Sequence, residues 1–157
     1  MLIEFQHYLT FDNIYLWSNF LVLPFWIMLI FIPNSRITQI FVNSIVLPLL
    51  FSTAYIYVLY QIILIDESIL NIFNLYLGID SLYALLSNEG FLVIFWLHFL
   101  AINLFIASWV SRDVIKYNIS RIISLFSLVL IYFFGPVGLV FYWIFRIFYS
   151  KKLGLHD

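Results

Sequence analysis

The sequence predicts an all-α membrane protein with four transmembrane helices in a single domain. The chain has 157 residues, of which 65% are hydrophobic and 10% are charged, and its mean hydropathy is +1.08. An average soluble domain is about 45–50% apolar and about 25% charged. Seven Lys and Arg and eight Asp and Glu are therefore too few to cover a water-soluble surface. The net charge of −1 and the absence of cysteine exclude a nucleic-acid binder and a disulfide scaffold.

Four apolar stretches are long enough to cross a hydrocarbon core of about 30 Å. We place them at about 15–32, 44–65, 91–110 and 122–148. The first three end at polar or helix-breaking residues, which are Pro33-Asn34-Ser35-Arg36, Asp66-Glu67 and Ser111-Arg112-Asp113. The prediction of four transmembrane helices rests on these four stretches.

The fourth stretch contains a break at Gly135-Pro136-Val137-Gly138. We predict a single helix that is kinked at Gly135-Pro136, because proline bends a helix without always ending it. The alternative is a re-entrant hairpin. Each half would then have about 13 residues and a length of about 20 Å, which is too short to span.

The basic residues predict the orientation of the spans. Loops one and three contain all of Arg36, Arg112, Lys116 and Arg121, so we place these two loops in the cytoplasm or stroma. Arg146, Lys151 and Lys152 lie at or beyond the end of the fourth stretch. In a four-span protein they would be on the opposite side, whereas a re-entrant hairpin would place all seven basic residues on one side.

The segment between the second and third spans predicts an interfacial amphipathic helix at about 67–86. Its apolar residues recur at helical spacing, both before Gly78 and after it: Ile69, Leu70, Phe73, Leu77, Leu82, Leu85 and Leu86. An apolar face without basic residues is typical of a helix that lies in the membrane interface. The alternative is a lid packed on the helix bundle.

The third span contains the strongest candidates for chemistry, because polar groups at membrane depth are costly. His98 lies nine residues after Glu89, or about 13.5 Å along a helix, near the expected midplane. We predict His98 and Glu89 as the catalytic candidates. The alternatives are that His98 forms a structural hydrogen bond, and that Glu89 caps the helix with Ser87 as N-cap. We expect no metal site, because His7 and His156 lie in the terminal segments.

Five further residues are candidates for binding a substrate. Tyr57, Tyr60 and Gln61 lie on one face of the second span, while Trp96 and Asn103 belong to the third. This face of the second span either lines a pocket or contacts other helices. The Asn103 amide is also suited to a hydrogen bond with a neighbouring helix.

Ordered motifs over about residues 17–148 resemble the abscisic-acid-deficient-four-like (neoxanthin synthase-like) family. They are Leu23-Pro24-Phe25-Trp26 with Ile32-Pro33-Asn34, Pro48-Leu49-Leu50 with Ala54-Tyr55, Ser87-x-Glu89, Trp96-x-His98-x-x-Ala101, Leu104-Phe105, Asp113 and Phe134-Gly135-Pro136-Val137-Gly138-Leu139. The chain departs from the family pattern at Asn103 and Ser108, where the family has Asp and Arg.

The resemblance implies a four-span membrane protein whose plant members are linked to converting violaxanthin into neoxanthin. Such an epoxide rearrangement needs an acid and a base, and His98 and Glu89 are the candidates for these roles. We therefore expect a protein that binds or isomerises carotenoids in the bilayer. The alternative is a non-catalytic scaffold or accessory subunit of another membrane complex. A transporter is disfavoured, because no charged residue is expected at the membrane centre and no inverted repeat is visible.

We expect membrane lipid and a carotenoid as partners, together with a membrane-protein partner or a second copy of the chain. Nucleic acid and a cofactor are not expected. Residues 1–10 contain no Lys or Arg, which predicts that no transit peptide is present. The expected location is therefore a bacterial inner membrane or a thylakoid-type membrane rather than a plastid.

Overall fold

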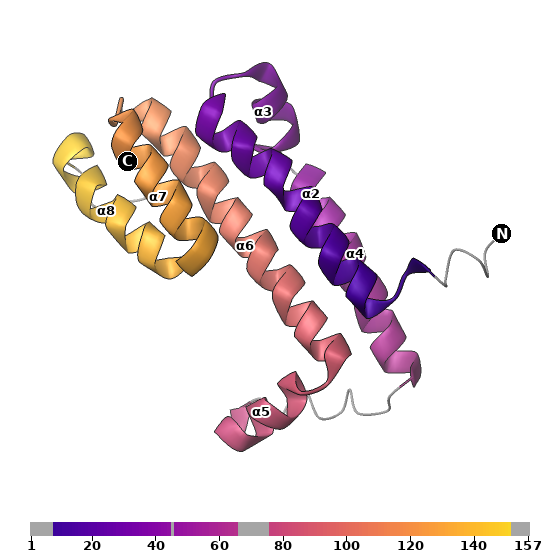
Figure 1. Ribbon diagram of the computed structural model, residues 1–157. Coiled ribbons are helices and arrows are strands. Elements are labelled where there is room, and N and C mark those ends of the chain that lie inside the picture. Colours follow the sequence, from indigo (N-terminus) through magenta and orange to yellow (C-terminus); the bar gives the residue numbers. More distant parts are fainter. Residues whose placement is uncertain (1–7, 45, 66–75, 152–157) are drawn as a thin grey trace. The chain divides into compact units, whose positions relative to one another are not determined.

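The computed structural model describes residues 8–44, 46–65 and 76–151, and every regular element in these ranges is a helix (Figure 1). In chain order the helices are α2 (Phe11–Phe31), α3 (Arg36–Phe41), α4 (Val46–Ile65), α5 (Ile79–Leu86), α6 (Glu89–Lys116), α7 (Arg121–Phe134) and α8 (Pro136–Ser150). The described ranges contain no strand. The all-α prediction is confirmed.

The chain divides into two compact units, which are described separately below. Unit 1 comprises Met1–Leu21 and Pro48–Leu100, and unit 2 comprises Val22–Leu47 and Ala101–Asp157. Helices α2 and α6 therefore begin in unit 1 and end in unit 2. The prediction of a single membrane domain over residues 1–157 stays a prediction.

Two of the described helices, α2 and α6, are long and apolar enough to cross a membrane. They correspond to the predicted spans 15–32 and 91–110, and α6 is longer than predicted because it continues to Lys116. Helix α4 coincides with the predicted span 44–65, although its apolar stretch, Leu49–Leu64, is shorter than that of α2 or α6.

The predicted fourth span, a kinked helix over 122–148, is wrong. Gly135 ends α7 with φ +48° and ψ −93°, and Pro136 starts α8, where its missing N–H costs no hydrogen bond. Helix α8 then folds back beside α7 (Figure 1). With 14 and 15 residues, each helix is only about 21–23 Å long, too short to span. The hairpin alternative is therefore the arrangement that forms.

Gly138 allows the two helices of this hairpin to approach closely. A Cβ atom at Gly138 would overlap the backbone nitrogen of Ile131 and would lie 2.6 Å from its side-chain Cγ1. Both Gly138 and Ile131 are buried in this contact. The motif Gly135-Pro136-Val137-Gly138 thus contains a helix end, a helix start and a close-packing position.

Helix α5 forms the end of the predicted interfacial helix 67–86, while residues 67–75 lie outside the described residues. None of the α5 side chains is buried, and those of Ile79 and Tyr83 are 80% and 76% exposed. A lid packed on the bundle would bury an apolar face, so these exposures favour the interfacial interpretation of α5.

The start of α6 differs from the expected cap at Ser87. The Asn88 side-chain oxygen accepts hydrogen bonds from the N–H groups of Gly90 and Phe91, which makes Asn88 the N-cap. The Ser87 hydroxyl instead donates to the Tyr83 carbonyl, at the end of α5. Gly90 then lies close to Ile62 of α4 and Phe11 of α2, so three helices of unit 1 meet at this point.

We expect Gly138→Ala to destabilise the protein, although alanine favours a helix over glycine by about 1 kcal/mol. Overlap with Ile131 should outweigh this gain and lower the free energy of unfolding by about 1–3 kcal/mol, as measured by circular dichroism in detergent. Val137→Ala, at the exposed neighbouring position, is the control and should change the stability by less than about 0.5 kcal/mol. A Gly138→Ala variant as stable as the wild type would contradict the hairpin packing.

Candidate functional site

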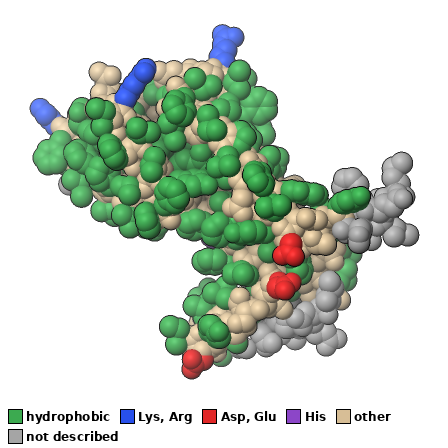
Figure 2. Space-filling model, viewed as in Figure 1, with side chains coloured by type: hydrophobic (Ala, Val, Ile, Leu, Met, Phe, Trp, Pro, Cys, Tyr) green, Lys and Arg blue, Asp and Glu red, His purple; other side chains and the backbone are tan. Residues whose placement is uncertain are grey.

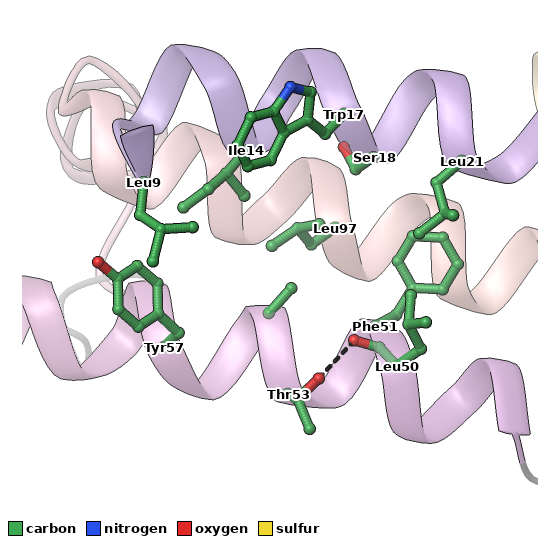
Figure 3. A pocket seen from close by; sticks show the side chains of 11 residues that line it. Leu9, Ile14, Trp17, Ser18, Leu21, Leu50, Phe51, Thr53, Tyr57 and Leu97 are labelled. Atoms are coloured by element: carbon green, nitrogen blue, oxygen red, sulfur yellow. Dashed lines mark hydrogen bonds between the residues drawn. The ribbon is translucent and has the colours of Figure 1, made fainter. Parts of the chain in front are cut away.

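An apolar pocket of about 410 Å³ lies among α2, α4 and α6 in unit 1 (Figure 3). In Figure 3, Leu9 and Tyr57 lie at one end, Phe51 and Leu21 at the other, and Leu97 of α6 between them. The full lining is Leu9, Ile14, Trp17, Ser18, Leu21, Leu50, Phe51, Thr53, Ala54, Tyr57 and Leu97.

The two small hydroxyl groups in this lining are already bonded within their own helices. Ser18 donates to the Tyr15 carbonyl at 2.8 Å, and Thr53 donates to the Leu50 carbonyl at 2.8 Å (Figure 3). Neither hydroxyl therefore needs a ligand to satisfy its hydrogen. The surface of this pocket is therefore almost entirely apolar.

A second, more polar pocket of about 440 Å³ shares Leu9 and Tyr57 with the apolar pocket. Its lining is Leu9, Thr10, Phe11, Asp12, Tyr57, Gln61 and Glu89. The Gln61 amide donates to the Tyr57 hydroxyl at 3.0 Å, which orients both side chains. Tyr57 thus borders the apolar pocket and also belongs to the hydrogen-bonded pair of the polar pocket.

Three of the predicted site residues meet in the polar pocket: Glu89, Tyr57 and Gln61. Tyr60 does not line either pocket, and its side chain is 56% exposed. Sequence reasoning missed Asp12, because we started the first span at Tyr15 and treated the preceding residues as a terminal segment. A carboxylate within the first turn of an apolar helix was the available signal.

Trp96 joins α6 to α2 instead of lining a pocket. Its indole N–H donates to the Asn19 side-chain oxygen at 3.0 Å, and the Asn19 amide donates to the Tyr15 carbonyl at 2.9 Å. The Trp96 ring also lies 5.6 Å from the Tyr15 ring and 5.4 Å from the Phe99 ring. Trp96 lines neither of the two pockets, and its role in binding a substrate stays a prediction.

His98 is exposed and lines neither of the two pockets. Nine residues separate it from Glu89, a rotation of about 180° around a helix, so the two side chains lie on opposite faces of α6. The structure does not bring the two catalytic candidates together. Within the described residues, no group of three His, Cys, Asp or Glu side chains is placed to hold a metal ion.

Asn103 and Ser108 belong to the interior of unit 2. The Ser108 hydroxyl donates to the Asn43 side-chain oxygen at 2.8 Å. Asn103 is 4% exposed, and a Cβ at Gly135 would lie 2.6 Å from its Oδ1. Its Nδ2 has no hydrogen-bond partner among the residues that the structure describes. The two positions at which the resemblance implies Asp and Arg thus lie in the core of unit 2.

Unit 2 also contains a buried ion pair that sequence reasoning missed. Arg146 Nε lies 2.5 Å from Asp113 Oδ2, and the Tyr142 hydroxyl donates to the same oxygen at 2.6 Å. Arg146 and Tyr142 are fully buried, and Asp113 is 6% exposed. The sequence analysis groups Arg146 with Lys151 and Lys152 at the end of the fourth stretch and does not link it to Asp113.

Three aromatic rings surround the Arg146 guanidinium. Its central carbon lies 5.0 Å from the ring centre of Trp143, 5.1 Å from that of Tyr117 and 5.9 Å from that of Trp109. A cation gains electrostatic energy over an aromatic face when water is excluded. The ion pair and the rings together attach α8 to the end of α6.

These features define a strongly apolar, all-helical protein with a ligand-sized pocket and a buried ion pair. The model of the ABA DEFICIENT 4-like family matches residues 13–142. The chain belongs to this family, which confirms the resemblance inferred from its motifs. Comparisons with curated proteins and with solved structures find no match.

We expect Arg146→Gln to lower the free energy of unfolding by about 3–5 kcal/mol, because Asp113 would remain buried without its counter-ion. The double variant Asp113→Asn/Arg146→Gln should lose less than the sum of the two single variants, as measured by unfolding in detergent. Arg112→Gln, at an exposed position on α6, is the control. Equal stability of Arg146→Gln and Arg112→Gln would show that the pair contributes little.

Proposed function

We propose that this protein is a multi-pass integral membrane protein that binds a carotenoid-class polyene in unit 1. The observation that carries the proposal is the apolar pocket that shares two wall residues with a polar pocket. Ligand pockets are commonly about 300–1,000 Å³, mostly apolar and supplied with a few convergent polar groups. The family membership supports the proposal, because the resemblance implies that plant members are linked to carotenoid conversion.

The exposed surface supports the membrane location. Figure 2 shows hydrophobic side chains over most of the visible face. Phe20, Ile56 and Leu64 are each more than 60% exposed, although they lie on the helices that form unit 1. Soluble monomers rarely expose apolar surface on this scale. A bilayer solvates such side chains without cost.

We propose three membrane passes, α2, α4 and α6, followed by the re-entrant hairpin of α7 and α8. Alternating passes place the loop containing Arg36 on the same side as the α6–α7 loop. The hairpin then returns the chain to that side, so all seven basic residues share it, as the positive-inside rule requires. A bacterial inner membrane or a thylakoid-type membrane fits this arrangement.

The polar pocket contains the groups that an epoxide rearrangement needs. One proton must reach the epoxide oxygen and one must leave the adjacent polyene carbon, so the overall change is an isomerisation without net oxidation. Glu89, Asp12 and Tyr57 are the proton-exchanging side chains in the pocket lining. We propose Glu89 as the principal acid–base group, because it begins the α6 helix that also contributes Leu97 to the apolar pocket.

A scaffold or accessory role has one observation in its favour. His98 is exposed on α6 beside Leu92 and Phe95, which are 52% and 53% exposed and lie at spacings of three residues. A polar side chain directed at lipid is costly unless a neighbouring helix bonds it. This face suits contact with a helix of another membrane protein or of a second copy.

We expect the wild-type protein, expressed in a bacterium that makes epoxide carotenoids, to purify with bound pigment. Ala54→Phe would fill the apolar pocket and should lower the bound pigment at least about tenfold, measured as visible absorbance per mole of protein. Ile56→Phe is the matched control, because Ile56 is 62% exposed on the same helix. Equal pigment in both variants, or a wild type that purifies without pigment, would contradict the proposal.

We expect Glu89→Gln to keep the pigment but to lower product formation about 10²-fold or more, since it removes the exchangeable proton. His98→Ala should leave both quantities unchanged, because His98 lines neither pocket. Chromatography of membrane pigments measures both outcomes. If the wild-type protein holds pigment but forms no product, the protein binds carotenoid without converting it. If His98→Ala loses product formation, His98 is a catalytic residue, contrary to this prediction.

A further inference from the structure

The lining of the apolar pocket in unit 1 includes three side-chain hydroxyl groups, which belong to Ser18, Thr53 and Tyr57. Each hydroxyl carries one proton, so it can donate one hydrogen bond, and its oxygen can also accept. Ser18 and Thr53 give their protons to carbonyls of their own helices, those of Tyr15 and Leu50. An occupant of the pocket therefore meets two hydroxyl groups whose protons are already used.

The Tyr57 hydroxyl is bonded in the opposite sense. The Gln61 amide Nε2 donates to the Tyr57 oxygen at 3.0 Å, so this bond uses an acceptor position of the hydroxyl and leaves its proton for another partner. Gln61 follows Tyr57 by four residues on α4, which places both side chains on one face of this helix. Of the three hydroxyl groups, that of Tyr57 is therefore the one that accepts from its own helix and keeps a proton to donate.

Tyr57 is half-buried and lies beside Leu9 at one end of the apolar pocket, with its hydroxyl oxygen turned away from the α4 ribbon (Figure 3). The carboxylates of Asp12 and Glu89, in the lining of the polar pocket, are the competing acceptors for its proton. All three residues lie within the described ranges, and no hydrogen bond joins Tyr57 to either carboxylate. The indole nitrogen of Trp17, another donor in the lining, lies on the side of its ring away from α4 (Figure 3). This end of the apolar pocket therefore offers a proton to an occupant.

We propose that Tyr57 is the specificity-determining hydrogen-bond donor of the apolar pocket, and that Gln61 is the positioning residue that leaves the Tyr57 proton for the occupant. The occupant favoured by this arrangement is an apolar chain with an acceptor oxygen, such as an ether or carbonyl oxygen, near the end that reaches Tyr57. A hydrocarbon would fill the same walls but would leave the Tyr57 proton without an acceptor. The inference rests on the proposed polyene-binding function and adds the group that discriminates among polyenes.

The test compares two polyenes of one skeleton, β-carotene and its monoepoxide, which differ by one acceptor oxygen. The full chain in detergent is incubated with an equimolar mixture, and chromatography of the extracted pigment gives the ratio of bound epoxide to bound β-carotene. Tyr57→Phe is measured in the same mixture, so any difference in solubility between the two polyenes cancels. We expect the wild-type ratio to exceed that of Tyr57→Phe about fivefold, which is the effect of one neutral hydrogen bond.

Gln61→Glu tests the direction of the hydrogen bond without removing the tyrosine. At about pH 8 a glutamate side chain is ionised and only accepts, so the Tyr57 proton would turn toward it. The ratio should then fall about as far as in Tyr57→Phe, while binding of β-carotene alone stays at the wild-type level in both variants. Tyr55→Phe is the matched control and should keep the wild-type ratio, because it removes a hydroxyl from a half-buried position of α4 that lines neither pocket.

The outcomes separate this inference from the proposed function. A wild type that binds neither polyene would contradict the proposed function, and the donor role of Tyr57 with it. A wild type that binds both, with an equal ratio in Tyr57→Phe, would overturn the donor role alone. A wild-type ratio in Gln61→Glu would overturn the positioning role of Gln61. If Tyr57→Phe loses β-carotene as well, Gln61→Glu decides, because it keeps the tyrosine and changes only the direction of its proton.

Discussion

The buried ion pair between Asp113 and Arg146 is the constraint on which the arrangement of unit 2 depends. Removing a charge from water costs several kcal/mol, so two charges become buried only where each finds the other with good geometry. Arg146 and Asp113 meet at 2.5 Å, and Tyr142 adds a second hydrogen bond to the same carboxylate oxygen. This requirement specifies where the last turn of α8 lies relative to the end of α6.

The α7–α8 hairpin brings Arg146 to Asp113 and so allows the ion pair to form. Its turn needs Gly135 in a left-handed conformation, and its packing needs a residue without a side chain at Gly138. Asn103 of α6 lies against the turn at Gly135, and Asp113 of α6 pairs with Arg146 near the end of α8, so α6 contacts the hairpin at both places. Gly135 and Gly138 therefore allow the hairpin to form, and the Asp113–Arg146 ion pair holds its second helix against α6.

Helix α6 contributes side chains to both compact units. Its first turns supply Glu89 and Leu97 to the pockets of unit 1, whereas its later turns supply Asn103, Ser108 and Asp113 to unit 2. Asn103 and Ser108 therefore line neither pocket. The Ser108 hydroxyl is neutral and bonds to Asn43, so this buried position needs no counter-ion. A charged side chain at the same place would need one.

The sequence by itself determined the helical class, the long helices near 15–32, 44–65 and 91–110, the family, and the placement of Tyr57 and Gln61 on one helix face. These follow from composition, from ordered motifs and from spacings within one helix, and the spacing of four residues places two side chains on one face. Only the tertiary structure decided the hairpin, the burial of Arg146, the presence of Asp12 and Glu89 in the lining of one pocket, and the exposure of His98. A Gly-Pro break permits either a kink or a reversal, and contacts between residues far apart in the chain, such as Asp113 with Arg146, select one of them.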